Sequence, residues 1–473
     1  MSGLLSQLAR IVGPSHVLTG TDAARYGCDW AGRDQGAPIA ALRPGSTKEV
    51  AGILRLANET STPIVPMSGN TGLTGGTSAA GALVVSLERM NAIREIRPEG
   101  RVAVVEAGAI LASIHDAAEA HGLIFPLSFG ARGSAMIGGA LSTNAGGSNV
   151  LRYGNTRDLC LGLEAVLPTG RIVTLMSQLH KDNSGYNLKH LLIGAEGTLG
   201  IITAATLRLF PKPRAYATAM AATRDVNAAL ALLNRLQEET GHGVEAFEYM
   251  PGGYMDTYLA RFPDARPPFV DRHEVNILIE LGATAPQDAQ PSEDGSLPVT
   301  TRLEEALAAA FERGEVLDAV VAQNDTQRQE MWARREAAAD VSRAYEPLVH
   351  NDIALPLDRM QEFLETTRAI LDRHDPGALT RDSSVAHLGD GNLHFGVGLT
   401  TDDPDLHEVI NREVEDAAVA MGGSFSAEHG IGLEKRSAMA RFKDPGALEA
   451  MHAIKSALDP NGILNPGKVL PPR

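Results

Sequence analysis

The sequence predicts a protein of two domains that mixes α-helices and β-strands. The chain has 473 residues, which is more than one hydrophobic core ordinarily serves. Helical and strand periodicities alternate along its first part, where the glycines cluster between Gly69 and Gly200. After Arg214 the glycines become sparse and long helical patterns begin, which indicates a second domain.

The first domain is expected to cover residues 1–213. Pro211, Lys212 and Pro213 interrupt the preceding strand pattern and mark the boundary. Apolar residues at helical spacing predict helices at 48–59 and 111–121. Short apolar runs that end in turn residues predict strands at 62–66, 83–87, 102–106 and 201–210.

The second domain is expected to cover residues 214–425. Its patterns predict long helices at 226–240 and 326–345, a strand at 275–281, and further strands around 386–399. The stretch 283–300 is polar and rich in proline, so we expect a surface loop there.

Composition excludes several classes of function. The 42 basic residues are outnumbered by 58 acidic ones, so the formal charge is −16, which is unsuitable for a nucleic-acid-binding protein. Cys28 and Cys160 match no metal or redox spacing and are expected to be free thiols in a reducing cytosol. No signal peptide and no spanning apolar run is visible. We therefore expect a cytoplasmic protein, with peripheral membrane association left open.

Three glycine-rich loops indicate a large ligand. Consecutive glycines let backbone N–H groups converge on an anion, although a single loop of this kind could be a flexible turn or serve core packing. Three such loops together favour backbone wrapped around a flat or polyphosphate ligand. No loop reads Gly-x-Gly-x-x-Gly or matches a P-loop, so a Rossmann domain is not expected. The loops span 66–76, 130–147 and 194–200.

The segment from His387 to His394 predicts a metal-binding hairpin. If residues 389–392 form a four-residue loop, His387 faces His394 across the two strands. Glu428, next to His429, offers a carboxylate. Two histidines and one carboxylate suit Zn, Mn or Fe, although these could also be polar turn residues without a ligand.

At this point the motifs resemble a known family, the FAD-linked oxidases of the vanillyl-alcohol oxidase superfamily. More narrowly, they resemble the D-2-hydroxyglutarate and D-lactate dehydrogenase group, which includes the glycolate oxidase flavoprotein subunit. The resemblance covers nearly the whole chain. Its motifs lie at 68–72, 143–147, 181–186, 194–203, 332–336, 387–394, 428–430 and 459–468.

The resemblance implies an α+β fold with a vanillyl-alcohol-oxidase-type (PCMH-type) FAD domain at 1–213. It also implies an α+β cap domain at 214–425 for substrate and metal, and a helical segment at 426–473 that packs back on the FAD domain. The first loop contains no histidine, so FAD is expected to be non-covalent. The implied FAD-binding residues are Ser68, Gly69, Asn70, Thr71, Gly72, Leu73, Pro126, Gly133, Ser134, Gly138, Gly139, Thr143, Asn144, Gly146, Gly147, Glu196, Gly197, Gly200, Ile201 and Ile202.

The resemblance also assigns the reacting residues. The metal ligands would be His387, His394 and Glu428, with Zn as the expected ion. His429 would be the catalytic base and would also bind substrate, and Arg335 would grip the substrate carboxylate.

Three positions depart from the family pattern, and all three reduce polar contacts. His350, a substrate-binding position, stands where relatives often have Lys. Gly396 stands where they often have Asn, and Ala339 where they often have Thr. We therefore expect a weaker grip on a second substrate carboxylate.

The resemblance implies an FAD-dependent dehydrogenase that oxidises a small D-2-hydroxy acid to a 2-oxo acid. The leading candidates for the substrate are D-2-hydroxyglutarate and D-lactate. Its electron acceptor would be an electron-transfer flavoprotein, a quinone or a cytochrome, and a homodimer is expected. One alternative is a glycolate-oxidase-type flavoprotein subunit that acts in a complex. Others are a metal hydrolase, which leaves the glycine loops unexplained, and an inactive flavin-binding assembly subunit.

Overall fold

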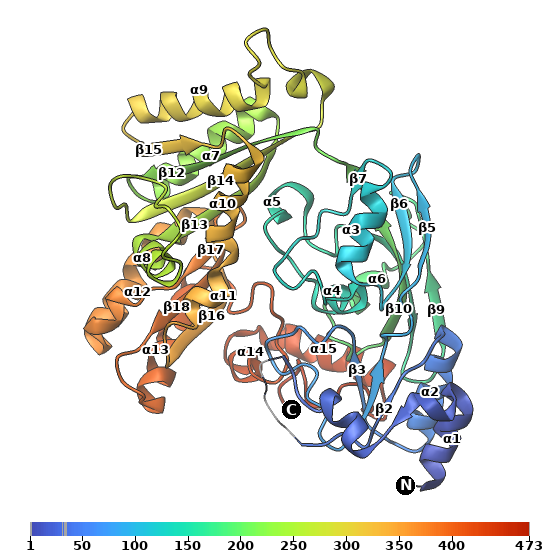
Figure 1. The fold of residues 1–473 in the computed structure, drawn as a ribbon. Coiled ribbons are helices and arrows are strands. Elements are labelled where there is room, and N and C mark those ends of the chain that lie inside the picture. Colours follow the sequence, from blue (N-terminus) through green and yellow to red (C-terminus); the bar gives the residue numbers. More distant parts are fainter. Residues whose placement is uncertain (1, 31, 33–35, 473) are drawn as a thin grey trace. The chain divides into compact units, whose positions relative to one another are not determined.

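The computed structural model describes residues 2–30, 32 and 36–472, and the chain divides into two compact units (Figure 1). The first unit contains the chain up to Gly146, residues 154–211, and the chain from His429 onward. The second unit contains residues 147–153 and 212–428. These limits lie close to the boundaries expected at 213 and 425, but the assignment of 147–153 to the second unit was not expected.

A four-stranded sheet opens the first unit, with the strand order β1-β2-β4-β3. Helix α2 (Thr47–Glu59) connects β2 to β3, and its amphipathic pattern buries Ile53, Leu54 and other apolar side chains. Ser46 caps this helix by accepting a hydrogen bond from the Glu49 N–H. The predicted helix at 48–59 is confirmed. The strands are β1 (Val17–Leu18), β2 (Ala40–Leu42), β3 (Ile64–Met67) and β4 (Leu83–Ser86).

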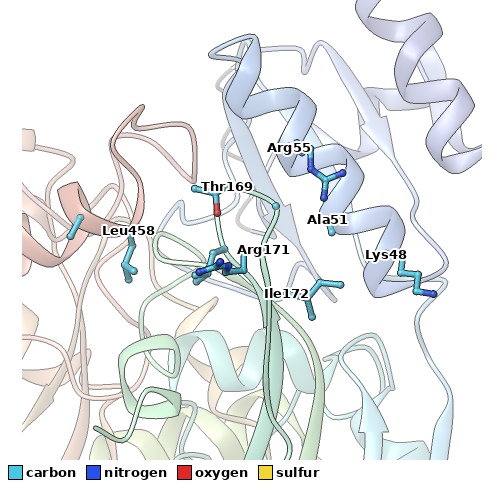
Figure 2. Close-up of a pocket in the computed structure, with 10 residues that line it drawn as sticks. Lys48, Ala51, Arg55, Thr169, Arg171, Ile172 and Leu458 are labelled. Atoms are coloured by element: carbon cyan, nitrogen blue, oxygen red, sulfur yellow. The ribbon is translucent and has the colours of Figure 1, made fainter. Parts of the chain in front are cut away.

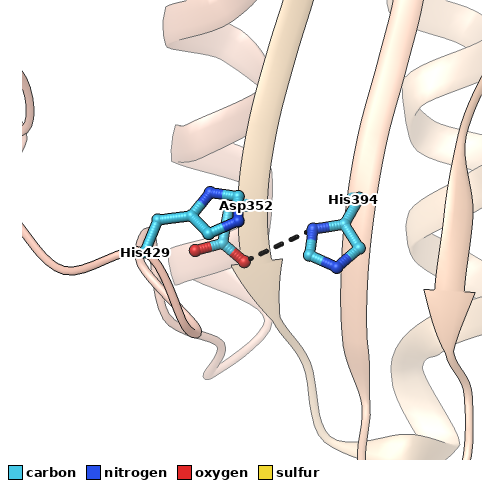
Figure 3. A group of neighbouring side chains, drawn as sticks. All are labelled: Asp352, His394 and His429. Atoms are coloured by element: carbon cyan, nitrogen blue, oxygen red, sulfur yellow. Dashed lines mark ion pairs between the residues drawn. The ribbon is translucent and has the colours of Figure 1, made fainter. Parts of the chain in front are cut away.

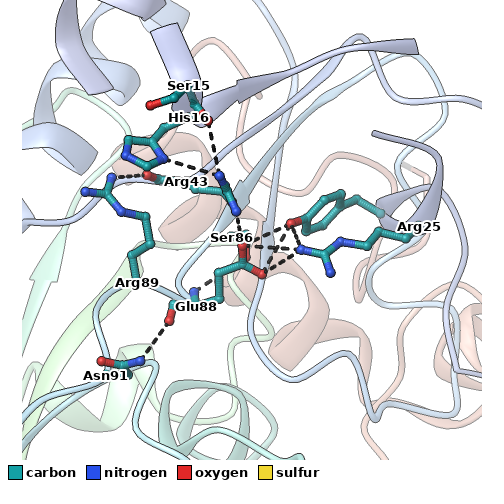
Figure 4. Close-up of polar contacts among 9 residues, drawn as sticks. Ser15, His16, Arg25, Arg43, Ser86, Glu88, Arg89 and Asn91 are labelled. Carbon is teal, nitrogen blue, oxygen red and sulfur yellow. Dashed lines mark hydrogen bonds and ion pairs between the residues drawn. The ribbon is translucent and has the colours of Figure 1, made fainter. Parts of the chain in front are cut away.

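The partly buried carboxylate of Glu88, just after β4, connects this strand to the N-terminal segment of the chain (Figure 4). Glu88 accepts hydrogen bonds from the Tyr26 hydroxyl and from the guanidinium groups of Arg25 and Arg43. Tyr26 lies at the end of the 3₁₀ helix η2 (Gly20–Tyr26). Because Arg25 and Tyr26 belong to η2 and Arg43 follows β2, Glu88 joins the N-terminal segment to the sheet.

A five-stranded antiparallel sheet forms the other layer of the first unit, with the order β5-β6-β10-β8-β9. Its central strand β10 (Ile201–Arg208) is buried along almost its whole length, as expected for a continuous apolar run. The other strands are β5 (Ile93–Arg97), β6 (Val102–Glu106), β8 (Cys160–Val166) and β9 (Ile172–Leu175).

Short helices complete the first unit, together with a small pair formed by β7 (Leu123–Ile124) and β11 (Phe210–Pro211). Cys28 and Cys160 are both free, as predicted, and burial raises the pKa of the Cys160 thiol to about 12. The helices are α1 (Ser2–Val12), η1 (Pro14–His16), α3 (Leu111–Glu119), α4 (Ile137–Thr143), α6 (Lys189–Leu192), α14 (Arg436–Phe442) and α15 (Pro445–Leu458).

The second unit is built on one antiparallel sheet of seven strands, in the order β15-β12-β14-β13-β17-β18-β16. The strands are β12 (Ala215–Thr223), β13 (Val244–Pro251), β14 (Val275–Ala283), β15 (Val316–Val321), β16 (Leu348–Ala354), β17 (Val385–His387) and β18 (Asn392–Gly398).

Two hydrophobic cores lie on opposite faces of this sheet. The larger core packs alternate strand residues against four long helices, and the smaller core packs the intervening residues against α8, α10 and α11 (Figure 1). The long helices are α7 (Val226–Thr240), α9 (Pro298–Glu312), α12 (Met360–His374) and α13 (Pro404–Ala420). The others are α5 (Val150–Tyr153), α8 (Gly252–Arg261), α10 (Asp325–Glu336), α11 (Ala338–Ser342), η3 (Pro286–Ala289), η4 (Leu357–Arg359) and η5 (Pro376–Thr380).

Two sequence predictions for the second unit need correction. The helix expected at 326–345 is interrupted at Ala337, whose ψ of 5° is not helical, and it becomes α10 and α11. The stretch 283–300 is not all loop, because it contains η3 and the start of α9 at Pro298. Proline is favourable in the first turn of a helix, so a proline-rich composition does not exclude the start of α9 at Pro298. Among the described residues, no helix is both long and apolar enough to cross a membrane.

Candidate functional site

The polar residues of the predicted site share one face of the seven-stranded sheet. Side chains of a strand alternate between its two faces, and Phe247 and Tyr249 of β13 both enter the larger core. Glu248 between them therefore faces the other way. The register pairs Glu248 with His387 of β17, and Asp352 of β16 with His394 of β18, so these four residues belong to the same face.

The hairpin that carries the two histidines has a different register from the one predicted. The loop comprises residues 388–391, and His387 pairs with Asn392 rather than with His394, which lies opposite Val385. Gly391 adopts a positive φ of 83°, and its N–H donates to the His387 carbonyl, which closes the turn. The shift moves the pairing by two positions. Side chains repeat every two residues, so both histidines still share a face.

His387, His394 and Glu428 come together as predicted. Their potential ligand atoms all lie within 4.8 Å of one another. The Nε2 atom of His387 is 4.0 Å from one Glu428 oxygen, and that of His394 is 3.8 Å from the other. The two imidazole rings meet almost edge to face, with centroids 5.4 Å apart. Two nitrogens and a carboxylate in this arrangement form a ligand set with room for further ligands.

Burial raises the pKa of the Glu428 carboxyl to about 7, and the nearby carboxylates of Asp352 and Asp390 act in the same direction. The charges of His387 and Arg335 oppose this shift. A carboxylate held in such surroundings is stabilised when a cation is close to it. The electrostatics of the cluster therefore favour a positive ion next to Glu428.

Asp352 is a functional candidate in addition to those expected from the sequence. It is buried on β16, and its Oδ1 atom lies 3.7 Å from Nδ1 of His394 (Figure 3). Its other oxygen accepts a hydrogen bond from the Glu428 N–H at 2.9 Å. Asn392 donates to Oδ1 at 3.0 Å. Asp352 thus contacts two of the predicted metal ligands, the ring of His394 and the backbone of Glu428.

Arg335, the predicted carboxylate grip, lies on α10 and is buried next to the histidine cluster. Its Nε atom is 2.7 Å from the Glu248 carboxylate, and its Nη2 atom is 3.4 Å from Nε2 of His387. Burial acts to raise the pKa of the Glu248 carboxyl. The positive charges and hydrogen bonds of His387 and Arg335 have the larger effect and hold this pKa below its usual value. Glu248 was not expected as a functional residue. Its one visible sign in the sequence was a glutamate within a largely apolar strand, which also contains Glu245.

Two of the residues that differ from the family pattern, His350 and Gly396, form one cross-strand pair. His350 lies opposite Gly396 and is exposed on β16, which is an edge strand. A Cβ atom added at Gly396 would lie 2.8 Å from the Ser383 hydroxyl oxygen, so a larger residue there requires Ser383 to move. Ala339, the third departure, is exposed on α11.

Glycines bring the three loops of the first unit into contact. A Cβ atom at Gly69 would lie 2.3 Å from the Ser134 carbonyl oxygen, and one at Gly197 would lie 2.4 Å from Pro66. At Gly138 it would meet Ala107 at 2.7 Å. These positions admit no side chain because backbone or small side chains of other segments approach closely there. Packing therefore explains part of the glycine pattern.

Other glycines of the loops have open space around them. A Cβ atom added at Gly72 or Gly133 would meet no atom within 4 Å, so packing does not explain these two glycines. Asn70 adopts a positive φ of 52°, and its side chain is fixed by Thr77 and by the Cys28 carbonyl. These positions remain candidates for backbone contact with a ligand.

Most of the remaining predicted FAD residues lie in these loops or close to them in the sequence. The loop after β3 holds Ser68, Thr71 and Leu73; Pro126 follows β7; and Ser134 precedes α4. Helix α4 contains Gly139 and Thr143, followed by Asn144 and Gly146, whereas Gly147 begins the segment assigned to the second unit. Gly200 precedes β10, which starts with Ile201 and Ile202.

Glu196 serves the C-terminal segment of the first unit. Its carboxylate accepts hydrogen bonds from the N–H groups of Ile431 and Gly432, at 2.7 and 2.9 Å. Thr74 donates to the carbonyl of His429 at 3.3 Å. His429, the predicted base, therefore has its backbone anchored in the first unit, while Glu428 before it belongs to the second unit.

A separate hollow of about 870 Å³ occurs in the first unit (Figure 2). Lys48 and Arg55 of α2, Arg171 at the turn between β8 and β9, and Leu458 at the end of α15 line it. None of the predicted site residues contributes to its lining.

Comparison with protein families shows two matches. Residues 212–469 match the family described as FAD linked oxidases, C-terminal domain, and residues 38–176 match an FAD binding domain. D-2-hydroxyglutarate dehydrogenase of Xanthomonas citri pv. viticola is 37% identical over 458 residues, covering 95% of this chain and 92% of that protein. The mitochondrial D-2-hydroxyglutarate dehydrogenase of Bos taurus is 34% identical, covering 99% and 83%.

Solved structures share the fold at low sequence identity. Substrate-bound p-cresol methylhydroxylase superposes with a TM-score of 0.75 at 17% identity, covering 99% of this chain and 96% of that chain. The 4-ethylphenol oxidase of Gulosibacter chungangensis has a TM-score of 0.72 at 19% identity, with the same coverage. The predicted α+β, PCMH-type fold is confirmed.

Gly69→Ala and Gly72→Ala should separate packing from ligand contact in the first loop. We expect Gly69→Ala to lower the free energy of unfolding by about 1–3 kcal/mol, because its methyl group collides with backbone. Gly72→Ala should change that free energy by less than about 0.5 kcal/mol, yet weaken FAD binding about tenfold. Denaturant titration and fluorescence titration of apoprotein with FAD measure the two effects. Unchanged FAD affinity in Gly72→Ala would exclude backbone contact at this position.

Proposed function

The chain belongs to the FAD-linked oxidase family, and from this premise we propose that it is an FAD-dependent dehydrogenase of D-2-hydroxy acids. In this proposal a divalent metal ion helps to bind the substrate, which leaves as a 2-oxo acid. The observation that carries it is the cluster of His387, His394 and Glu428 with Arg335 beside it.

The donor set supports a divalent metal ion. His387 and His394 each direct Nε2 toward a different oxygen of Glu428, at 4.0 and 3.8 Å. Imidazole nitrogens and a carboxylate suit Zn²⁺, with Mn²⁺ or Fe²⁺ as alternatives. A site with only three protein ligands leaves coordination positions open, as a catalytic role requires.

The residues of the chain would divide the work as follows. Arg335 binds the C1 carboxylate of the substrate through its Nη groups, because its Nε already lies against Glu248. His429 accepts the proton of the 2-hydroxyl group at an imidazole nitrogen. FAD, when bound, supplies the hydride acceptor, and the metal supplies a Lewis acid for the hydroxyl oxygen.

The substrate proposed is a small 2-hydroxy acid, with D-2-hydroxyglutarate and D-lactate as the leading candidates. His350 and Gly396 form one cross-strand pair, so this chain combines an imidazole with an adjacent residue that has no side chain. This pair supplies less fixed positive charge than a lysine and an asparagine would, and we propose that it relaxes selection for a second carboxylate. The electron acceptor, the homodimer and the cytoplasmic location stay predictions.

A panel of 2-hydroxy acids tests the proposed activity. Purified protein should be yellow, and it should reduce an artificial acceptor with D-2-hydroxyglutarate or D-lactate but not with the L-enantiomers. The flavin absorbance should bleach on anaerobic addition of the active substrate. A colourless protein that takes up no FAD, or a yellow protein that no D-2-hydroxy acid reduces, would contradict the proposal.

His387→Ala and His394→Ala should each lower kcat/KM by at least about a hundredfold, because each removes a metal ligand. FAD should stay bound, since the FAD loops lie in the other unit. Metal analysis should show the loss of bound metal. The control is His374→Ala, which removes a histidine on α12 that interacts with Glu413. Full activity in the double mutant His387→Ala/His394→Ala would disprove the role of the metal.

The preference for a diacid over a monoacid should depend on the charge at position 350. The ratio of kcat/KM for D-2-hydroxyglutarate to that for D-lactate should rise at least about threefold in His350→Lys, because lysine supplies a fixed positive charge, whereas His350→Gln should give no such rise. A ratio that His350→Lys leaves unchanged would show that position 350 does not contact the second carboxylate.

A further inference from the structure

Glu248 occupies a position between the two functional groups of the second unit. It is 0% exposed, and the register of β13 and β17 places it directly opposite His387. Both carboxylate oxygens lie near Nδ1 of His387, Oε1 at 2.9 Å and Oε2 at 2.8 Å, and Oε2 also lies 2.7 Å from Nε of Arg335. One carboxylate thus contacts both the first metal ligand and the predicted substrate grip.

The contact with His387 determines which ring nitrogen is available to a metal. A carboxylate can only accept hydrogen bonds, so Nδ1 of His387 must carry the hydrogen. Nε2 is then left with its lone pair, and this is the atom that lies 4.0 Å from the Glu428 oxygen. Metal-binding histidines commonly donate their second ring N–H to a carboxylate in this way.

The contact with Arg335 orients the guanidinium group. With Nε next to Glu248, the Nη groups project from the other end of the guanidinium group, where Nη2 lies 3.5 Å from Nδ1 and 3.4 Å from Nε2 of His387. A positive charge buried without a partner is unfavourable, so the carboxylate also compensates the charge of Arg335 inside the protein. The Glu248 side chain therefore orients both His387, a proposed metal ligand, and Arg335, the proposed binder of the substrate carboxylate.

We propose that Glu248 is a positioning residue that sets the His387 tautomer for metal binding and aligns Arg335 for the substrate carboxylate. This inference rests on the proposed function. The backbone supports the arrangement, since the Gly389 N–H at the hairpin turn donates to the Phe247 carbonyl on β13, next to Glu248. The turn that carries His387 is therefore held against the strand that carries Glu248.

Glu248→Gln is the discriminating substitution because it changes hydrogen bonding with little change in shape. A guanidinium group only donates, so the amide oxygen should take the Oε2 position next to Arg335, and the NH₂ group should take the Oε1 position, 2.9 Å from Nδ1 of His387. The NH₂ group favours Nδ1 as an acceptor, so the tautomer with its hydrogen on Nε2, which blocks this metal ligand, gains population at the expense of the Nδ1–H tautomer. We expect Zn²⁺ affinity to fall at least about tenfold, with KM for the substrate also increased.

Glu245→Gln is the matched control. Glu245 is buried on the same strand and pairs with Arg152 at 2.7 Å and with the Tyr153 hydroxyl at 2.6 Å, but it touches none of the proposed ligands. The Glu245→Gln variant should lose about as much stability as Glu248→Gln, but it should bind Zn²⁺ as tightly as the unmodified protein does. Competition with a chromogenic chelator, on FAD-loaded full-length protein without substrate, measures the affinity.

The outcomes separate this inference from the function on which it rests. If the unmodified protein binds Zn²⁺ and Glu248→Gln binds it equally well, or if Glu245→Gln weakens binding to the same degree, the role of Glu248 is disproved. If the unmodified protein binds no metal, the proposed function itself fails. A second measurement needs no variant at position 248: ¹⁵N spectra of metal-free protein, assigned with His387→Gln, should show the hydrogen of His387 on Nδ1. Finding it on Nε2 would overturn the inference.

Discussion

The buried carboxylate of Glu248 is the interaction on which the polar face of the second unit depends. An unpaired charge with no exposure to water is strongly unfavourable, so Glu248 requires both His387 and Arg335. Glu280 on the neighbouring strand β14 is also buried, and its carboxylate accepts hydrogen bonds from Arg328, Trp332 and Thr218. Because Arg328, Trp332 and Arg335 all lie on α10, the two glutamates together hold this helix against the sheet.

The first unit depends on a different constraint, the absence of side chains where loops touch. Gly69, Gly138 and Gly197 allow atoms of separate segments to approach closer than a Cβ atom permits. The C-terminal segment joins this core through Glu196 and through Lys455, whose ammonium group donates to the carbonyls of Thr198 and Leu464. The peptide bond between Glu428 and His429 is where the chain passes from the second unit back to the first.

The candidate site was only partly visible in the sequence. The spacing of His387 and His394 predicted two histidines on one face, and that prediction survives even though the register of the hairpin was wrong. Glu248 was missed because its partners come from α10 and β17, which lie 87 and 139 residues further along the chain. A charged residue within an apolar strand has no local pattern that reveals its partner.

The sequence by itself determined the elements whose information is local. The helix at 226–240 and the strand at 102–106 have the predicted bounds, because hydrophobic periodicity and caps depend on neighbouring residues. Only the tertiary structure decided the register of the hairpin, which glycines serve packing, and which carboxylate faces His387. Each of these depends on contacts between segments far apart in sequence. The free energy of such contacts comes from burial and pairing that exist only once the chain has folded.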